Sequence, residues 1–307
     1  MPLGYFNPLN WIKYLRFFKL NRFDVVCDFN ANFAGIPLLL ARLAGVKRRF
    51  VFYRQGRDHF TQSFIKGVYN KLLNRLVYKY ATQILSNSKA SLAFFFFYRQ
   101  STDNRFKVIY NGVDKNWLVD DIDKEKLRAE LGIPNDAFII GHSGRLDKAK
   151  NHSTILAVAA EIIAVNKNIY FLICGKGTEE LKDQVVKMKI QDKVILLGYR
   201  NDVNHLLKIM DAFYFPSVTE GQPNALIEAI LAGLPFVASN IDAISEIIPD
   251  ELKSNLVHPM DIESAKDKLI KIINFKKEPG TTNTYPWAHE LFDGNNRFEE
   301  FLSALLN

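Results

Sequence analysis

The stretch DAFYFPSVTEGQPNALIEAILAGLPFVAS, residues 211–239, decides the fold class of this chain. An apolar run at 212–217 leads through a Gly-Gln-Pro-Asn turn into helix-like apolar spacing at 223–232, and a second apolar run follows at 235–239. Short apolar runs joined by a helix are typical of parallel βαβ units. The start of that helix would present free backbone N–H groups and the positive end of the helix dipole, which together favour a phosphate group.

Two carboxylates, Glu220 and Glu228, flank the start of this predicted helix. Eight residues span at most about 12 Å in a helix, which resembles the reach from a ribose across a diphosphate to a hexose. Glu228 lies among Ala, Leu and Ile. A carboxylate there either faces solvent or takes a partner such as a ribose diol, whose two hydroxyl hydrogens it can accept. The spacing therefore favours a site for a nucleoside diphosphate sugar.

The same alternation runs through the rest of the second half of the chain. Strands are predicted at 138–143, 169–174, 193–198, 212–217 and 235–239, and helices near 152–165, 178–189, 202–210, 223–232 and 261–274. This pattern predicts a doubly wound parallel sheet. Irregular chain is predicted after Pro279, followed by a last helix at 295–306.

The first half repeats the alternation on a smaller scale. Strands at 24–28, 49–53, 82–87 and 107–110 alternate with helices at 34–45, 62–80 and 88–99. A polar stretch at 114–136 separates the two halves. The sequence therefore predicts one α/β domain over residues 1–135, a second over 136–284 and a C-terminal segment over 285–307.

Composition limits the class of protein. The 307 residues are 48% apolar, enough for two globular cores. No apolar run reaches the ~18 residues that a membrane-spanning helix needs, and the N-terminus lacks the features of a signal peptide. Cys27 and Cys174 lie in apolar segments without metal-like spacing, which predicts two buried, reduced thiols in a cytosolic protein.

The net charge of +7 is divided unevenly along the chain. Residues 1–107 hold 18 Lys and Arg against 4 Asp and Glu, whereas the remaining residues hold 22 against 29. This asymmetry indicates an anionic partner for the first half: a membrane surface, an anionic acceptor or nucleic acid. Nucleic acid is disfavoured, because the basic residues lack the stacking aromatics of single-strand binders.

Residues 9–20, LNWIKYLRFFKL, interleave Lys13, Arg16 and Lys19 with apolar side chains. The pattern fits either a basic amphipathic helix on an anionic membrane or a surface helix packed on its own domain. The aromatic run at 94–98 leaves a similar choice between a core or interface and membrane contact.

Two motifs that would point to other chemistry are rejected. Asp121-Ile122-Asp123 matches the DxD metal motif of other sugar transferases, but acidic residues at the start of a charged helix more often cap it. The Gly-Lys-Gly at 175–177 lacks the third glycine of a dinucleotide fingerprint and predicts a structural turn beside the nucleotide. With no metal constellation in the sequence, neither a resident metal nor a cofactor is expected.

The candidate site residues follow the predicted strands of the second half. Because the carboxyl ends of parallel strands meet at one edge of a sheet, these residues are expected to converge. An Arg and a Lys beside a glycine suit a diphosphate, although both could simply solvate a loop. The predicted donor-binding residues are Gly144, Arg145, Lys150, Gly175, Tyr199, Glu220, Gly221, Gln222, Asn224, Ala225 and Glu228.

In order along the chain, GRL-x3-KN from Gly144, ICGKG, LGYRNDV and the E-x7-E segment resemble glycosyltransferase family 4. In the first half, FKVIYNGVD (106–114) and DVVCDFNANFAGIPLLLARLAGV also resemble that family, so the likeness covers about residues 22–275. It implies two Rossmann-like domains of the GT-B type facing a cleft, a retaining reaction and a nucleotide-sugar donor. It also implies that the C-terminal helix crosses back to the first domain.

The resemblance implies a role for each matching residue. Arg145 and Lys150 would bind the donor diphosphate and stabilise the leaving group as charge develops. Glu220 would contact hydroxyls of the transferred sugar, and Glu228 would bind the ribose. Backbone N–H groups at the helix start would cap the phosphate.

The first half departs from the family pattern. Family members begin with a strand and a glycine-rich loop that precede the segment matched here, so a shortened acceptor domain is expected. Members often carry a His after the strand that 49–53 matches, where this chain has Arg54-Gln55-Gly56. His59 follows a little later, either as a catalytic residue in the cleft or as an ordinary loop histidine.

The expected activity is retaining transfer of a hexose-type sugar from a nucleoside diphosphate sugar to a glycan or lipid-linked acceptor. The resemblance places it in bacterial surface polysaccharide synthesis, in the cytoplasm or peripherally at the inner face of the plasma membrane. A nucleotide-sugar-binding module without transfer activity is the alternative, because the acceptor domain is incomplete. A sugar-nucleotide epimerase of the same fold is a weaker one.

Overall fold

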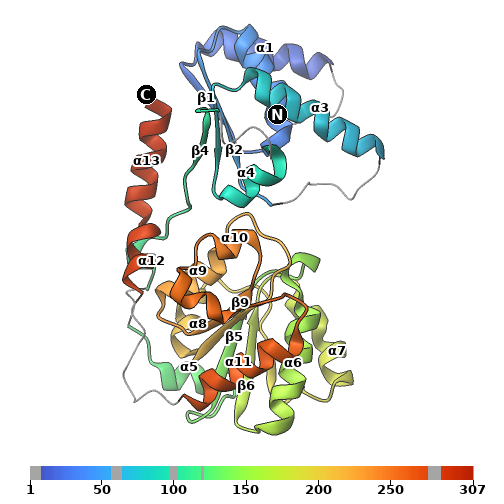
Figure 1. Ribbon diagram of the computed structural model, residues 1–307, viewed down its shortest axis with the longest axis vertical. Helices are drawn as coiled ribbons and strands as arrows, with labels where there is room; N and C mark the ends of the chain where they lie inside the picture. Colours follow the sequence, from blue (N-terminus) through green and yellow to red (C-terminus); the bar gives the residue numbers. More distant parts are fainter. Residues whose placement is uncertain (1–7, 57–63, 97–102, 119–120, 276–284, 307) are drawn as a thin grey trace. The chain divides into compact units, whose positions relative to one another are not determined.

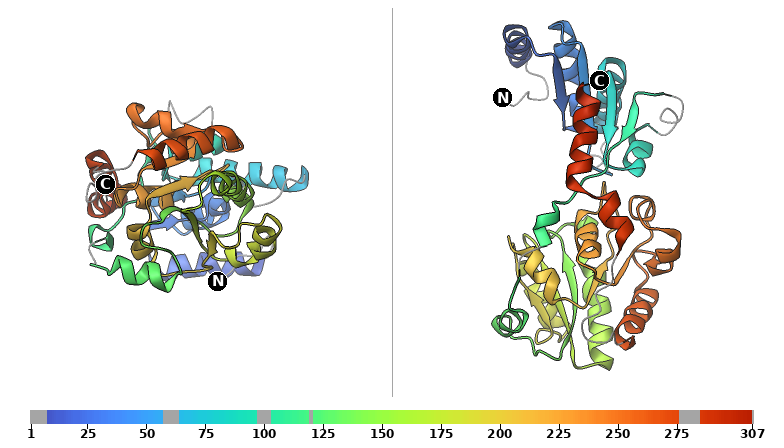
Figure 2. Two further views of the ribbon diagram at one scale, coloured as in Figure 1. Left: turned by 90° about the horizontal axis from the view of Figure 1, so that it is seen from below. Right: turned by 90° about the vertical axis from the view of Figure 1, so that its left-hand side faces the viewer.

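The computed structural model describes residues 8–56, 64–96, 103–118, 121–275 and 285–306. These residues form two compact units, unit 1 (Met1–Asn111 with Asn296–Asn307) and unit 2 (Gly112–Asn295). Each unit contains a parallel sheet with helices around it, as Figures 1 and 2 show. The predicted pair of parallel α/β domains is therefore confirmed.

Unit 2 has a six-stranded parallel sheet in the order β10-β9-β8-β5-β6-β7. Its strands are β5 (Phe138–Ser143), β6 (Ile169–Cys174), β7 (Val194–Leu196), β8 (Ala212–Phe215), β9 (Phe236–Ser239) and β10 (Leu256–Val257). The order runs outward in one direction from β5 to β7 and in the other from β8 to β10. Strand order thus reverses between β5 and β8, the place where doubly wound sheets bind ligands.

Helices cover both faces of this sheet. The helical segments of unit 2 are η2 (Lys115–Leu118), α5 (Lys124–Glu130), η3 (Lys148–Lys150), α6 (His152–Val165), η4 (Thr178–Leu181), α7 (Lys182–Lys187), α8 (Val203–Ile209), α9 (Asn224–Leu231), α10 (Asp242–Ser245), η5 (Asp250–Asn255), α11 (Ile262–Asn274) and α12 (Pro286–Leu291). Buried residues of α6, α7 and α11 share one core cluster with the sheet. Figure 1 shows α8 and α9 on the opposite side of the sheet from α6.

Unit 1 has a four-stranded parallel sheet in simple sequential order, β1-β2-β3-β4. Its strands are β1 (Val25–Asp28), β2 (Arg48–Tyr53), β3 (Gln83–Ser86) and β4 (Phe106–Val108). Its helical segments are α1 (Pro8–Asn21), η1 (Ala31–Ala34), α2 (Gly35–Leu43), α3 (Phe64–Tyr80), α4 (Lys89–Phe96) and most of α13 (Gly294–Leu306).

The alternation of side chains along β2 explains how this sheet is covered. Val51 and Tyr53 pack in one cluster with residues of α2, α3 and α4. Phe50 and Phe52 pack on the other face with Ala304 of α13. The last helix of the chain therefore completes the core of unit 1 (Figure 1).

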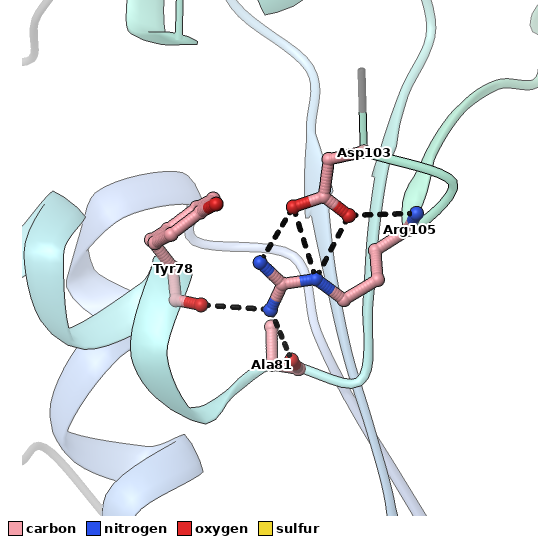
Figure 3. A network of polar contacts seen from close by, with 4 residues as sticks. All are labelled: Tyr78, Ala81, Asp103 and Arg105. Atoms are coloured by element: carbon pink, nitrogen blue, oxygen red, sulfur yellow. Dashed lines mark hydrogen bonds and ion pairs between the residues drawn. The ribbon is translucent and has the colours of Figure 1, made fainter. Parts of the chain in front are cut away.

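One polar network fastens the start of β4 to the end of α3 (Figure 3). The Arg105 guanidinium donates to the carbonyl oxygens of Tyr78 at 2.8 Å and Ala81 at 3.1 Å, and pairs with Asp103 at 2.7 Å. These carbonyl groups lie at the C-terminal end of a helix, where no following turn supplies N–H donors. A cation is favourable there because it can donate to them. The hydrogen bonds from Arg105 hold the pKa of Asp103 at about 2.

The segment after Asn111 belongs to unit 2, whereas the sequence placed the domain boundary between residues 135 and 136. Arg128 gives the physical reason, since its guanidinium donates to Ile209 O at 2.8 Å and to Asp211 at 3.2 Å. Val113 also pairs with Asp293 in an isolated bridge. Asp123 caps α5 by accepting from Lys126 N at 3.0 Å, so the capping role predicted for the acidic stretch is confirmed at that residue.

The region after residue 284 differs from the prediction of irregular chain. Helix α12 begins at Pro286, a residue whose missing N–H and fixed φ suit the first position of a helix. Ala288 and Phe292 are buried. The prediction of irregular chain is therefore wrong over Pro286–Leu291.

Candidate functional site

The loops after β5 and β8 meet where the strand order of unit 2 reverses. Lys150, at the end of the β5 loop, places Nζ 2.6 Å from Oε1 of Glu220 in the β8 loop. The two side chains are only 18% and 11% exposed. The Lys150 ammonium also lies 4.8 Å from the ring centre of Phe215 in β8. The structure thus brings together two predicted site residues 70 positions apart in sequence.

The β5 loop is held in shape by its own residues and by the neighbouring loop. Asp147 accepts from Ala149 N at 2.8 Å, and Ala149 O accepts from Val218 N at 2.8 Å. Asn151 adopts a left-handed conformation with φ of 57°. Its amide donates to Pro216 O at 3.1 Å and Pro259 O at 2.8 Å. These bonds fix the backbone on both sides of Lys150.

Two glycines allow the β5 and β6 loops to approach closely. Gly175 has a φ of 145°, and a Cβ on it would lie 2.1 Å from Gly144 O. Gly144 N donates to Cys174 O at 2.9 Å, and Gly175 N donates to Gly198 O at 2.7 Å. The Gly-Lys-Gly segment is therefore a turn, and its first position, Gly175, has no room for a larger residue.

Glu228 projects from the first turns of α9 into partly buried surroundings. Burial raises the pKa of its carboxyl to about 7, and the charge of Lys150 opposes that rise. The alternative of a Glu228 fully in solvent is not what the structure shows. A carboxylate with a raised pKa beside a fixed cation is typical of functional sites.

The start of α9 has its own local geometry. Pro223 precedes the helix, and Asn224 N donates to Gln222 O at 3.0 Å. Gly221 and Gln222 are buried, Ala225 is half-buried and Asn224 is exposed.

Arg145 and Tyr199 stand apart from the buried pair. The Arg145 side chain is 71% exposed and lies 3.8 Å from Asp147, and Tyr199 is 75% exposed. Both follow strands whose carboxyl ends form the site edge, as predicted, but neither is fixed by close contacts of the kind that hold Lys150. His59 lies outside the described residues.

Two histidines that no sequence motif singled out lie beside the β5 loop. His142 and His152 are 1% and 4% exposed, and their ring centres are 5.1 Å apart. In the sequence they could have been found by their position next to the motif, since His142 stands two residues before Gly144 and His152 two residues after Lys150.

In the part of the chain that the structure describes, no three His, Cys, Asp or Glu side chains gather closely enough to hold a metal ion. Of the helices described, none combines the length and apolar character needed to cross a bilayer. The described thiols are both free; Cys174 is buried and Cys27 only partly so.

Comparison with known families accounts for nearly the whole chain. Residues 123–283 match "Glycosyl transferases group 1", and residues 1–117 match "Glycosyltransferase Family 4". The chain belongs to the family 4 glycosyltransferases. The resemblance inferred from the motifs at the strand ends is thereby confirmed.

The individual relatives of this family 4 chain share 30% or less of its sequence in the two comparisons given below. It is 30% identical over 280 residues to the UDP-Gal:alpha-D-GlcNAc-diphosphoundecaprenol alpha-1,3-galactosyltransferase of Escherichia coli, across 86% of this chain and 70% of that protein. It is 27% identical over 248 residues to the capsular polysaccharide biosynthesis glycosyltransferase CapH of Staphylococcus aureus, across 76% of this chain and 64% of that protein.

A solved structure confirms the GT-B fold of the family 4 chain. Anabaena HepE in complex with UDP-glucose has a TM-score of 0.82 at 22% identity, covering 99% of this chain and 84% of that chain.

Proposed function

We propose that this chain transfers a hexose-type sugar, with retention, from a nucleoside diphosphate sugar to a glycan or lipid-linked acceptor of a bacterial surface polysaccharide. The observation that carries the proposal is the 2.6 Å pair of Lys150 and Glu220 across the reversal of strand order in unit 2. A partly buried cation at that place suits a diphosphate, which needs charge neutralisation and close backbone approach.

The proposed chemistry follows from the charges of the site. Lys150 neutralises the donor diphosphate and stabilises the negative charge that grows on it as the sugar departs. Because Lys150 is already paired with Glu220, its ammonium is oriented before the donor binds. Glu220 then accepts hydrogen bonds from hydroxyls of the sugar, and ionised Glu228 accepts both hydroxyl hydrogens of the ribose. Arg145 adds a second, more exposed cation, and no resident metal or cofactor is part of the proposal.

The relatives support a choice of donor and acceptor to test first. The name of the Escherichia coli relative specifies UDP-Gal and a diphosphoundecaprenol-linked acceptor, and the HepE structure contains UDP-glucose. We therefore propose a UDP-sugar as donor and a sugar linked to a lipid diphosphate as acceptor.

The test is a transfer assay with UDP-glucose and UDP-galactose and a polyprenyl diphosphate sugar as acceptor. Glu220→Ala is expected to reduce transfer at least roughly a hundredfold, as expected for loss of a polar contact to the transition state. Glu251→Ala, an exposed carboxylate of η5, serves as the matched control. Equal transfer by both variants would reject the site. Tight UDP binding by calorimetry without transfer to any acceptor would instead support a binding module.

A peripheral membrane location is a second part of the proposal, and unit 1 carries it. On α1, Leu9 and Leu20 are 69% and 82% exposed, while other side chains of the helix pack near α2. On α3, Phe64, Val68 and Leu72 form an exposed stripe at four-residue spacing, with exposed fractions of 88%, 54% and 51%. The same unit carries the positive charge, which complements anionic lipid headgroups.

Sedimentation with vesicles of phosphatidylglycerol and phosphatidylcholine tests this location. Binding is expected to require the anionic lipid, to weaken with added salt, and to fall when Val68→Ser and Leu72→Ser are combined. Val165→Ser, an exposed valine of unit 2 with an exposed fraction of 74%, is the control. An absence of binding at low salt would reject the membrane location.

A further inference from the structure

His142 and His152 bracket the loop that carries Gly144 and Lys150, and the proposed chemistry uses neither of them. Both rings are almost completely buried, at 1% and 4% exposure, and they meet edge to face at 5.1 Å. Among the residues that the structure describes, His142 Nε2 and both ring nitrogens of His152 have no well-aligned hydrogen-bond partner. Burying a polar nitrogen without a hydrogen bond costs folding free energy, so such groups in a folded protein call for an explanation.

His142 connects the two strands at the reversal beyond their last backbone pair. The β5–β8 register ends with Gly141 opposite Phe213. One residue further along each strand, the Nδ1 of His142 lies 3.0 Å from Tyr214 O. A carbonyl oxygen can only accept, so Nδ1 carries the hydrogen and donates it. The side chain therefore replaces a ladder bond where β5 and β8 begin to separate.

Burial and the nearby Lys150 ammonium favour the neutral form of the His142 ring. Burial, together with the neighbouring His152 and Lys150, lowers the pKa of His142 to about 3, although the bond to Tyr214 O opposes the change. Since Nδ1 carries the hydrogen, Nε2 of the neutral ring carries no hydrogen and can only accept a hydrogen bond. A protonated ring would instead repel the Lys150 ammonium.

The ring of His142 and the stem of Lys150 enclose Gly144. A Cβ placed on residue 144 would lie 3.0 Å from His142 Nε2 and 3.2 Å from Lys150 Cδ. The same His142 ring lies 5.8 Å from the ring of Phe215, over which the Lys150 ammonium stands. The histidine and the lysine stem thus lie next to the same glycine and the same aromatic ring.

His152 contributes from the start of α6. Burial lowers its pKa, and its interaction with the Gly144 backbone opposes that change. Its ring meets the His142 ring edge to face at 5.1 Å. Both histidines therefore act on the same two residues, Gly144 and Lys150.

We propose that His142 and His152 are positioning residues for the diphosphate site: a pair of buried rings in edge-to-face contact that sets the β5–β8 separation and the place of the Lys150 ammonium. The inference rests on the proposed function, because it concerns how the same anion site is built. The pair acts through Lys150 and Gly144 and touches no reacting atom.

The experiment measures UDP affinity by calorimetry for two substitutions of His142. His142→Leu fills the space but cannot donate to Tyr214 O, and it is expected to weaken UDP binding roughly tenfold, about 1.4 kcal/mol. His142→Asn places an amide N–H near the position of Nδ1 and is expected to restore affinity to within about threefold of the parent. Leu269→Ala, a buried change on α11, controls for general loss of stability.

A double-mutant cycle with Lys150→Ala distinguishes positioning from folding. His142→Leu is expected to change UDP affinity far less in the Lys150→Ala background than in the parent, because the lysine that it positions is gone. The same losses in both backgrounds, or a loss no greater than that of Leu269→Ala, would overturn the inference while leaving the proposed function standing. If the parent binds neither UDP nor GDP, both the inference and the proposed function fall.

Discussion

Units 1 and 2 are built from the same parallel α/β units, yet their sheets differ in strand order. The sheet of unit 1 runs β1-β2-β3-β4 in sequence, whereas that of unit 2 reverses between β5 and β8. At the reversal, the two following helices leave to opposite faces and the loops separate, which makes room for a ligand. The charged pair of Lys150 and Glu220 stands at that place.

The corresponding edge of unit 1 is closed by neutral hydrogen bonds. Asn87 N donates to Tyr53 O at 3.2 Å, and Ser91 Oγ donates to Gln55 O at 2.6 Å. The first bond joins the ends of β2 and β3, and the second joins α4 to the segment that follows β2. Strand order, rather than composition, therefore accounts for the place of the proposed anion site, because unit 1 is the more basic half of the chain.

The largest expected effect comes from Lys150→Ala. Loss of this partly buried cation would remove the proposed neutralisation of the leaving diphosphate and would leave the Glu220 charge unpaired, so kcat/KM is expected to fall roughly a thousandfold. Transfer kinetics and UDP calorimetry measure it. Lys148→Ala, an exposed lysine of the same short helix, and Lys89→Ala, at the carboxyl edge of unit 1, should change either value less than twofold. A comparable loss in Lys89→Ala would break the contrast between the units.

Two glycines with positive φ, Gly175 in unit 2 and Gly45 in unit 1, test whether close approach of loops constrains unit 2 more than unit 1. Gly175→Ala would force a Cβ to 2.1 Å from Gly144 O at a φ of 145°, and is expected to cost about 3 kcal/mol or more in unfolding free energy. Gly45→Ala in unit 1 meets nothing within 4 Å at a φ of 91°, so only about 1 kcal/mol of backbone strain is expected. Denaturant unfolding measures both. Equal costs would mean that the close approach of the β5 and β6 loops is not a constraint.

Glu228→Gln tests whether burial raises the pKa of a carboxyl group in unit 2. Folding raises the pKa of this carboxyl from 4.5 to about 7. The stabilisation by the protonated form is therefore complete below pH 4.5 and is lost as the pH rises through about 7. Glu228→Gln should then be more stable than the parent at pH 8, by up to about 3 kcal/mol, and no more stable at pH 4.5. Thermal unfolding at the two pH values measures the difference.

The same substitution should carry a cost in binding. An amide cannot accept both ribose hydroxyl hydrogens as a carboxylate does, so affinity for UDP-glucose is expected to fall about tenfold at pH 8. In the parent, affinity should also fall as the pH drops below about 7. An unchanged affinity in Glu228→Gln would remove Glu228 from the site while leaving Lys150 in place.

The smallest effect is expected for Arg145→Ala. Its side chain is 71% exposed and makes only a 3.8 Å contact with Asp147. A solvent-exposed cation contributes less than a buried one, so UDP affinity should fall roughly threefold and in a salt-dependent manner. Calorimetry at low and high salt checks this. A loss as large as that of Lys150→Ala would show that Arg145 closes over the ligand.

Local sequence was sufficient for the parts of the molecule that depend on neighbours in the chain. Apolar spacing predicted the βαβ unit around Glu220 and Glu228, and the structure contains it as β8, α9 and β9. The capping role of Asp123 depends on Lys126, three residues away, and was predicted for the same reason. Helix α12 was missed because a proline at a helix start and one in irregular chain look alike without their surroundings.

Local sequence patterns were enough to predict the fold class, the family and the strand ends that carry the candidate site, because these follow from periodicity and from motifs confined to single loops. Only the tertiary structure decided that Lys150 pairs with Glu220, that Arg145 stays in solvent and that His142 bonds Tyr214 O. Such contacts join segments about 70 positions apart, across a reversal of strand order that no local pattern encodes. Burial and pairing are properties of the packed sheet, so the chemistry of the site emerges only when β5 and β8 lie side by side.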